Sequence, residues 1–304
     1  MLRKRFYVGI QPLNNAVTGS LHLCVAKSPD GETVRFIVDC GLFQERVEKV
    51  NDEDESAREN INDLYNRSFP FTEDSLDFSL ITHNHVDHVG RLPLLYKNGY
   101  AGKTYMSIPT KELIRHALND SCKVLRETAK RRHVSALYTD TDVGQALSNF
   151  YGMPYDEPFY LVPNKVKVTF FKNGHLVGAA LILVQIYSSS SKEVINLLFT
   201  GDYNKKNMFF KVPDLPKWLY ELPVTIIQES TYGNMDTTDI EECFEENILR
   251  GTREQKTIVV PAFSLGRYQE VLYFLKTLQK RGALDPNIPI YDDGKLAATY
   301  TNMF

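Results

Sequence analysis

Short runs rich in β-branched and aromatic residues recur along the chain and are separated by polar turns that contain glycine. Runs of this length and composition are typical of β-strands. They predict strands at residues 6–10, 22–26, 34–38, 76–82, 165–171, 180–186, 194–200 and 224–228. Two later runs, at residues 257–261 and 288–291, predict further strands.

Apolar residues spaced three and four positions apart predict helices between these strands. The pattern places helices at residues 87–98, 111–133 and 266–280. In the second of these, Leu113, Ala117 and Leu118 lie on one face. Because strands and helices alternate, the sequence predicts an α/β fold whose sheets are covered by helices.

Two charged segments stand out from this pattern. Residues 45–63 are polar and rich in acidic side chains, which is typical of a solvated loop or a surface helix. Residues 123–133 give the second predicted helix a strongly basic end. That end is either a solvated helix face or a face that contacts phosphate, and the sequence leaves both interpretations open.

The composition is that of an ordinary globular protein. With 304 residues, the chain is long enough for about two domains, or for one domain with a large insertion. Its net charge of −3 argues against a polycation that coats nucleic acid, although a local basic groove remains open. No apolar run approaches the ~20 residues of a membrane helix, and no signal peptide is recognisable.

The four cysteines, Cys24, Cys40, Cys122 and Cys243, are scattered and form no CxxC pair. This spacing argues against a cysteine-rich zinc site and against a disulfide scaffold. The sequence therefore predicts reduced, mostly buried thiols in a cytoplasmic protein.

The strongest chemical signal is the segment Thr-His-Asn-His-Val-Asp-His at residues 82–88, which holds three of the seven histidines. In an extended backbone, His83 and His85 point to the same side and can hold one metal ion. Asp87 and His88 follow where the chain turns into the predicted helix, so they can face a second ion. Imidazole and carboxylate ligands without thiolate suit a hydrolytic zinc, iron or manganese site. The alternative is a histidine-rich loop without metal.

More candidate ligands follow other predicted strands. His175 and Asp202 come just after the strands predicted at residues 165–171 and 194–200, where they can converge on one edge of a sheet. Asp202 could bridge two ions through its two oxygens. Asp39, at the end of another strand, is a candidate hydrogen-bond acceptor that orients a ligand or a water molecule. Each of these residues alone is a weak signal, and the prediction depends on the set.

Taken in order, these motifs resemble the metallo-β-lactamase superfamily, whose fold is an αββα sandwich with a two-metal site at one edge. Residues 229–233 (Glu-Ser-Thr-Tyr-Gly) and 261–270 (Pro-Ala-Phe-Ser-Leu-Gly-Arg-Tyr-Gln-Glu) resemble the β-CASP group of nucleases. That group includes the nuclease subunit of the eukaryotic pre-mRNA cleavage and polyadenylation factor and its bacterial and archaeal relatives. Residues 17–22, 41–44 and 89–93 are similar to the bacterial relatives in particular.

The resemblance covers nearly the whole chain and implies its domain organisation. Residues 1–232 would form the metallo-β-lactamase domain, and residues 233–304 the start of an inserted β-CASP domain whose C-terminal part is missing. The group has two further histidine motifs downstream, and no histidine follows His175. We therefore expect a truncated chain with an incomplete second metal site.

The resemblance also implies a role for each candidate residue. His83, His85 and His175 would hold the first zinc ion, Asp87 and His88 the second, and Asp202 would bridge the two. Asp87, Asp39 and Glu229 would serve catalysis, Asp87 by orienting or deprotonating the attacking water and Glu229 by supporting the site. Ser264 and Arg267 would contact a backbone phosphate of the substrate; an ordinary strand–turn–helix connection is the equal alternative. His22 is interpreted as structural.

The expected function is that of a zinc-dependent ribonuclease acting on single-stranded RNA, with two Zn²⁺ activating the attacking water. It would be an endonuclease, with 5′-exonuclease activity as an option. Two alternatives are kept: a catalytically silent nucleic-acid-binding or scaffold subunit, and a small-molecule metallo-hydrolase of the same superfamily. The resemblance further implies a homodimer, or a partner that completes the site.

Overall fold

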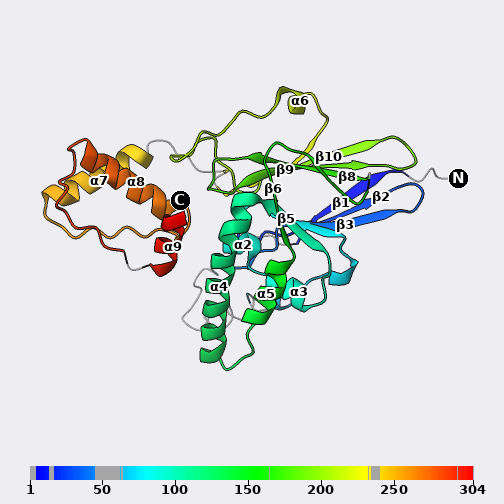
Figure 1. The fold of residues 1–304 in the computed structure, drawn as a ribbon, viewed down its shortest axis with the longest axis horizontal. Coiled ribbons are helices and arrows are strands. Elements are labelled where there is room, and N and C mark those ends of the chain that lie inside the picture. Colours follow the sequence, from blue (N-terminus) through cyan, green and yellow to red (C-terminus); the bar gives the residue numbers. More distant parts are fainter. Residues whose placement is uncertain are drawn as a thin grey trace. The chain divides into compact units, whose positions relative to one another are not determined.

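The computed structural model of the chain (Figure 1) describes residues 5–13, 17–44, 62, 64–163, 165–231, 233, 240–292 and 294–303. Apart from Asn62, the acidic segment predicted as a loop or surface helix at residues 45–63 lies outside the described residues. The chain divides into two compact units, which we describe separately. Unit 1 comprises Met1–Asn207 and Lys211–Glu229, and unit 2 comprises Met208–Phe210 and Ser230–Phe304.

Unit 1 contains two mixed β-sheets. In the first, β1, β2 and β3 pair antiparallel, and β3 to β6 pair parallel. In the second, the order is β11-β10-β9-β8-β7, and only β10 and β11 are parallel. The strands of the first sheet are β1 (Tyr7–Pro12), β2 (His22–Lys27), β3 (Thr33–Val38), β4 (Phe78–Leu80), β5 (Lys103–Ser107) and β6 (Phe150–Met153). Those of the second are β7 (Phe159–Leu161), β8 (Val166–Lys172), β9 (Ala180–Tyr187), β10 (Val194–Phe199) and β11 (Thr225–Ile227).

The two sheets pack face to face through one apolar layer (Figure 1). Phe36 on β3 stacks on Phe78 of the neighbouring strand, with ring centroids 4.9 Å apart. From the second sheet, Phe170 and Ile182 join the same buried cluster. Burial of these side chains from both sheets stabilises the sandwich.

Helices cover the outer face of the first sheet. Ile37 and Met106 from this sheet are buried against Leu95, Ile114 and other apolar residues of the helices. The second sheet has a thinner cover, in which Leu219 of the single-turn helix α6 packs on its outer face. This layering confirms the predicted α/β class and the two-sheet sandwich. The helices of unit 1 are α2 (Val86–Val89), α3 (Leu92–Lys97), α4 (Ile108–Arg131), α5 (Asp140–Ser148) and α6 (Lys217–Tyr220).

The helix predicted at residues 87–98 is in fact two helices, α2 and α3. The chain turns between them because the backbone N–H of Arg91 donates to Cys40 O at 2.9 Å, and Pro93 occupies the first turn of α3. Proline has no N–H and clashes with the preceding turn in a helix interior, so it favours a new helix start.

Unit 2 contains α7 (Ile240–Arg253), α8 (Arg267–Lys280) and α9 (Lys295–Met303), with a small core that includes Ile248, Leu278 and Leu284. The prediction of strands at residues 257–261 and 288–291 is wrong, because both segments are irregular. A strand is stabilised by hydrogen bonds to a neighbouring strand, and the described residues of unit 2 include none.

Three of the cysteines, Cys24, Cys40 and Cys122, are buried and free, as predicted, whereas Cys243 is exposed. Among the described residues, no helix combines the length and the apolar character needed to span a lipid bilayer.

Candidate metal centre

Four of the predicted site residues lie where strands of the two sheets end at the same edge of the sandwich. Asp39 directly follows β3, and His83 lies three residues after β4. His175 lies in the loop between β8 and β9, and Asp202 follows β10. The backbone N–H of Ala180, at the start of β9, donates to Thr82 O at 2.9 Å and links the two sheets beside the site. Segments far apart in sequence therefore converge.

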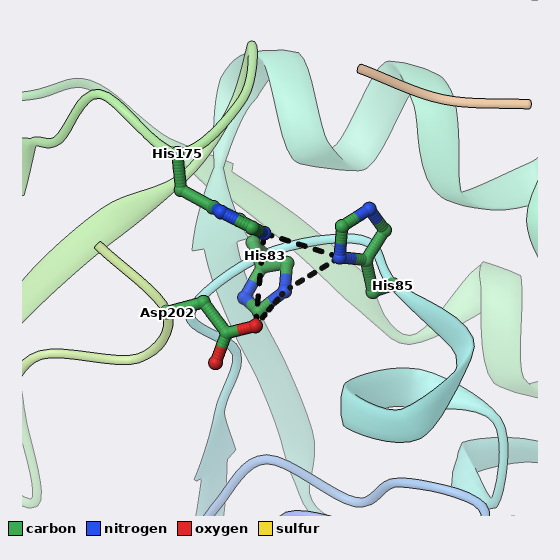
Figure 2. Close-up of side chains that lie close together, drawn as sticks. All are labelled: His83, His85, His175 and Asp202. Atoms are coloured by element: carbon green, nitrogen blue, oxygen red, sulfur yellow. Dashed lines mark hydrogen bonds and ion pairs between the residues drawn. The ribbon is translucent and has the colours of Figure 1, made fainter. Parts of the chain in front are cut away.

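Three histidines and one aspartate form a tight cluster (Figure 2). One possible ligand atom from each of His83, His85, His175 and Asp202 lies within 4.8 Å of all the others. His85 Nδ1 is 3.2 Å from His83 Nε2 and 3.1 Å from His175 Nε2. Nitrogen ligands 2.0–2.1 Å from a tetrahedral zinc ion lie about 3.3–3.4 Å apart. The donor set and its spacing therefore fit a zinc-like metal.

The two carboxylate oxygens of Asp202 face different neighbours. Oδ2 lies 3.8 Å from His83 Nε2 and 3.7 Å from His175 Nε2, on the side of the three-histidine cluster. Oδ1 lies 3.4 Å from His88 Nε2. The same His88 nitrogen is 3.8 Å from Asp87 Oδ2. Asp202 thus stands between the two predicted sets of ligands, as a bridging carboxylate would.

Asp39 is 1% exposed and makes its contacts inside the protein. Its Oδ1 accepts a 2.8 Å hydrogen bond from the backbone N–H of Thr82, and its Oδ2 lies 2.8 Å from His88 Nδ1. The hydroxyls of Thr82 and Ser20 also donate to this carboxylate. Asp39 therefore orients His88 and the start of the histidine segment.

Burial and neighbouring charges shift the protonation equilibria of the cluster in opposite directions. Burial, together with the other histidines, holds the pKa of His83 well below its usual range. Burial also opposes the charged form of His88, but Asp39, Asp202 and Asp87 outweigh it and raise the pKa of His88 well above the usual range. The pKa of Asp202 is lowered to about 2, because His88 and the other histidines outweigh the effect of burial. Asp202 is therefore an ionised carboxylate among imidazoles.

A close backbone approach fixes the helix that carries Asp87 and His88. A Cβ atom on Gly41 would lie 1.5 Å from Asp87 O, so only glycine fits there. Cys40 N–H donates to His88 O at 2.7 Å, and Leu42 N–H donates to Val86 O at 3.0 Å. The segment after β3 is therefore held against α2 by backbone hydrogen bonds.

Several residues that support the site were not identified from the sequence. The buried Arg91 guanidinium donates to Gly41 O at 2.7 Å and to Tyr65 O at 2.6 Å. The hydroxyls of Ser107 and Thr110, at the start of α4, both donate to Gly178 O. These hydrogen bonds hold the Gly41 segment and the loop that carries His175 in place. Only Arg91 gave any signal, as part of the bacterial-type motif at residues 89–93.

The remaining predicted residues are not members of the four-residue cluster. Glu229 Oε1 accepts from the backbone N–H of Tyr203 at 3.3 Å, so it contacts the loop that carries Asp202. His22 packs edge-on against Phe199, with centroids 5.8 Å apart, and burial lowers its pKa. Ser264 and Arg267 lie at the start of α8 in unit 2, where Arg267 Nη1 pairs with Glu270 Oε2 at 2.7 Å.

Curated proteins with similar sequences include three named for RNA processing or transcription. Ribonuclease TTHA0252 of Thermus thermophilus is 31% identical over 292 residues, which cover 95% of this chain and 58% of that protein. Transcription termination factor FttA of Methanosarcina mazei is 30% identical over an aligned region that covers 86% of this chain and 38% of that protein. Endoribonuclease ysh1 of Schizosaccharomyces pombe is 29% identical over an aligned region that covers 77% of this chain and 30% of that protein. No family model matches the chain.

Solved structures with a similar fold include the Rm3 metallo-beta-lactamase, with a TM-score of 0.34 and 15% identity over 94% of this chain and 88% of that one. The metallo-beta-lactamase fold protein YhfI from Bacillus subtilis has a TM-score of 0.32 and 16% identity over 64% of this chain and 62% of that one.

The sequence similarity makes this chain a homologue of the β-CASP nucleases, and the predicted relationship is confirmed. Among these homologues, ribonuclease TTHA0252 matches along nearly the whole chain. The chain spans little more than half the length of that ribonuclease, and less of the other two relatives.

Proposed function

We propose that this chain acts as a zinc-dependent ribonuclease that hydrolyses phosphodiester bonds of single-stranded RNA, primarily as an endonuclease. The observation that carries the proposal is the cluster of His83, His85, His175 and Asp202, whose ligand atoms lie within 4.8 Å of one another. Relatives named ribonuclease and endoribonuclease support RNA as the substrate.

In this proposal, His83, His85 and His175 would hold one zinc ion, Asp87 and His88 would hold the second, and Asp202 would contribute to both sites. The orientation of the two Asp202 oxygens supports the last assignment, since one faces the three histidines and the other faces His88. Two bound zinc ions would supply charge neutralisation at the scissile phosphate and a lower pKa for water.

The protein side chains would then orient the water, the metal ligands and the substrate. Asp87 orients the attacking water and accepts its proton, since its carboxylate is partly exposed beside His88. Asp39 keeps His88 in the tautomer that presents Nε2 to the metal. Glu229 holds the backbone of the Asp202 loop. In unit 2, Ser264 and Arg267 are proposed contacts for an RNA phosphate, at the start of the 14-residue helix α8.

Three further assignments belong to the same proposal. Residues 1–232 form the metallo-β-lactamase domain, and residues 233–304 belong to a β-CASP domain. The protein works in the cytoplasm. It pairs with a second copy or with another protein chain.

The test is cleavage of a fluorescently labelled single-stranded RNA by the purified chain. We expect cleavage that is lost with a chelator, restored by added zinc and absent from His83→Ala and His175→Ala variants. A double-stranded RNA and a DNA of the same sequence serve as substrate controls. RNA binding without cleavage, in a chain loaded with two zinc ions, would favour the silent binding subunit, whereas turnover of a thioester or lactam without RNA cleavage would favour a small-molecule hydrolase.

A further inference from the structure

The two candidate ligands contributed by the second sheet both lie in loops. His175 lies in the loop after β8, and Asp202 lies in the loop after β10. No helix or strand fixes either side chain, yet His175 Nε2 and Asp202 Oδ2 lie 3.7 Å apart. Some contact between the two loops must therefore set their separation.

The side chain of Asn173 spans these two loops. Its Oδ1 accepts a 2.8 Å hydrogen bond from the backbone N–H of His175. Its Nδ2 donates to Asp202 O at 3.1 Å, and also lies 3.4 Å from Thr200 O. One amide group therefore contacts the backbone of both candidate ligands.

The contact made by Asn173 lies in a buried and closely packed region. The residue is 2% exposed, so its amide has little access to water that could replace a lost partner. The next residue, Gly174, donates its N–H to Asn204 O at 2.8 Å, and a Cβ there would lie 2.5 Å from the same oxygen. The two loops are therefore packed backbone to backbone, and the Asn173 amide is a buried side-chain cross-link between them, beside a more exposed one from Asn207 Nδ2 to Gly174 O at 3.1 Å.

We propose that Asn173 is a positioning residue that sets the distance between His175 and Asp202 and thereby the metal affinity of the site. It touches neither metal nor substrate, and it acts through the backbones of the two ligands. The inference rests on the proposed metal site and adds a determinant of affinity that lies outside the ligand set. Outer hydrogen-bond partners of metal ligands typically change metal affinity 10- to 100-fold.

The test compares Asn173→Ala with Asn173→Asp and with a matched control, Asn196→Ala. Asn196 on β10 is also buried, at 6% exposure, and also links two segments, since its Nδ2 donates to Pro223 O at 3.0 Å. Zinc affinity is measured by competition with a chelator of known strength. The visible spectrum of the Co²⁺-substituted full chain reports the ligand geometry.

We expect Asn173→Ala to bind zinc about 10- to 100-fold more weakly and to shift the Co²⁺ spectrum. Asn173→Asp keeps an acceptor for His175 N–H but loses the donated bonds, so it should weaken binding as much as Asn173→Ala does. Asn196→Ala should lower the melting temperature of the metal-free chain and leave zinc affinity within about twofold. The inference is overturned if Asn173→Ala binds zinc like the wild type, or if Asn196→Ala loses as much affinity. Failure of the wild-type chain to bind zinc would instead refute the proposed function.

Discussion

The carboxylate of Asp39 lies 2.8 Å from Nδ1 of His88, and both side chains are nearly inaccessible to water. A carboxylate at this nitrogen keeps a proton on Nδ1 and leaves Nε2 for the opposite side of the ring. On that side, Nε2 lies 3.4 Å from Asp202 Oδ1. Asp39 thus influences the candidate metal centre through the orientation of His88.

This relationship predicts that Asp39→Asn weakens metal binding without unfolding the chain. Asp39 has φ of 61°, a conformation that asparagine tolerates, and an amide oxygen can still accept from Thr82 N–H. Loss of the charge facing His88 should reduce zinc affinity about 10- to 100-fold. Asp39→Ala should in addition destabilise the fold by about 2 kcal/mol, because the buried Thr82 N–H loses its partner. Zinc titration and urea unfolding of both variants test this, and unchanged affinity in Asp39→Asn would contradict it.

Replacing the carboxylate of Asp202 by its amide should reduce zinc affinity much more than the same replacement at Glu229. The carboxylate of Asp202, with its pKa lowered to about 2, is a charged group among the histidines, so Asp202→Asn should cost more than about 100-fold in zinc affinity. Glu229→Gln keeps an oxygen that can accept from Tyr203 N–H and should change affinity by less than about threefold. Equilibrium zinc binding measures both. A loss in Glu229→Gln as large as that in Asp202→Asn would contradict a supporting role of Glu229 through the Tyr203 backbone.

The close approach at Gly41 gives a prediction about stability. Gly41→Ala would place a Cβ 1.5 Å from Asp87 O and push α2 away, at a cost of about 3 kcal/mol or more. Gly144→Ala is the matched control, since Gly144 lies in α5 with no atom within 4 Å of the added Cβ. That control should gain about 0.5–1 kcal/mol from helix propensity. Chemical denaturation of the two variants measures the contrast, and equal stability would mean that α2 is not held against the Gly41 segment.

Much of the site's location could be predicted from the sequence because its residues follow strands. His83, His175 and Asp202 each lie three residues after the end of a strand, and the structure brings these strand ends to one edge. Their partners could not be predicted in this way. Ser107 donates to Gly178 O across 71 residues, and the acceptor is a backbone carbonyl that has no sequence signature.

The errors in the secondary structure have a related cause. β5 was missed because its sequence, Lys-Thr-Tyr-Met-Ser, contains no long apolar run, yet it pairs with β4 and β6 inside the first sheet. Conversely, residues 257–261 have strand-like composition but form no strand, and Val259 is 82% exposed. Strand formation depends on a neighbour to pair with, which local composition does not report.

A last prediction concerns His22, which the sequence suggested is structural. Its ring is partly buried against Phe199, and Nδ1 makes no hydrogen bond within the described part of the chain. Burial holds the pKa of His22 below 6.5, although Asp39 opposes this effect. As the pH falls below about 6.5, His22 therefore takes up a proton more readily in the unfolded chain than in the folded chain.

It follows that His22 lowers the free energy of unfolding as the solution becomes acidic. Between pH 7.5 and pH 5.5, acidification should therefore destabilise the wild-type chain relative to His22→Gln, because glutamine does not titrate. Urea unfolding of both proteins at the two pH values, in the presence of a chelator, measures the difference. An equal or larger loss in His22→Gln would mean that His22 is protonated in the folded chain, and that Asp39 outweighs the burial of its ring.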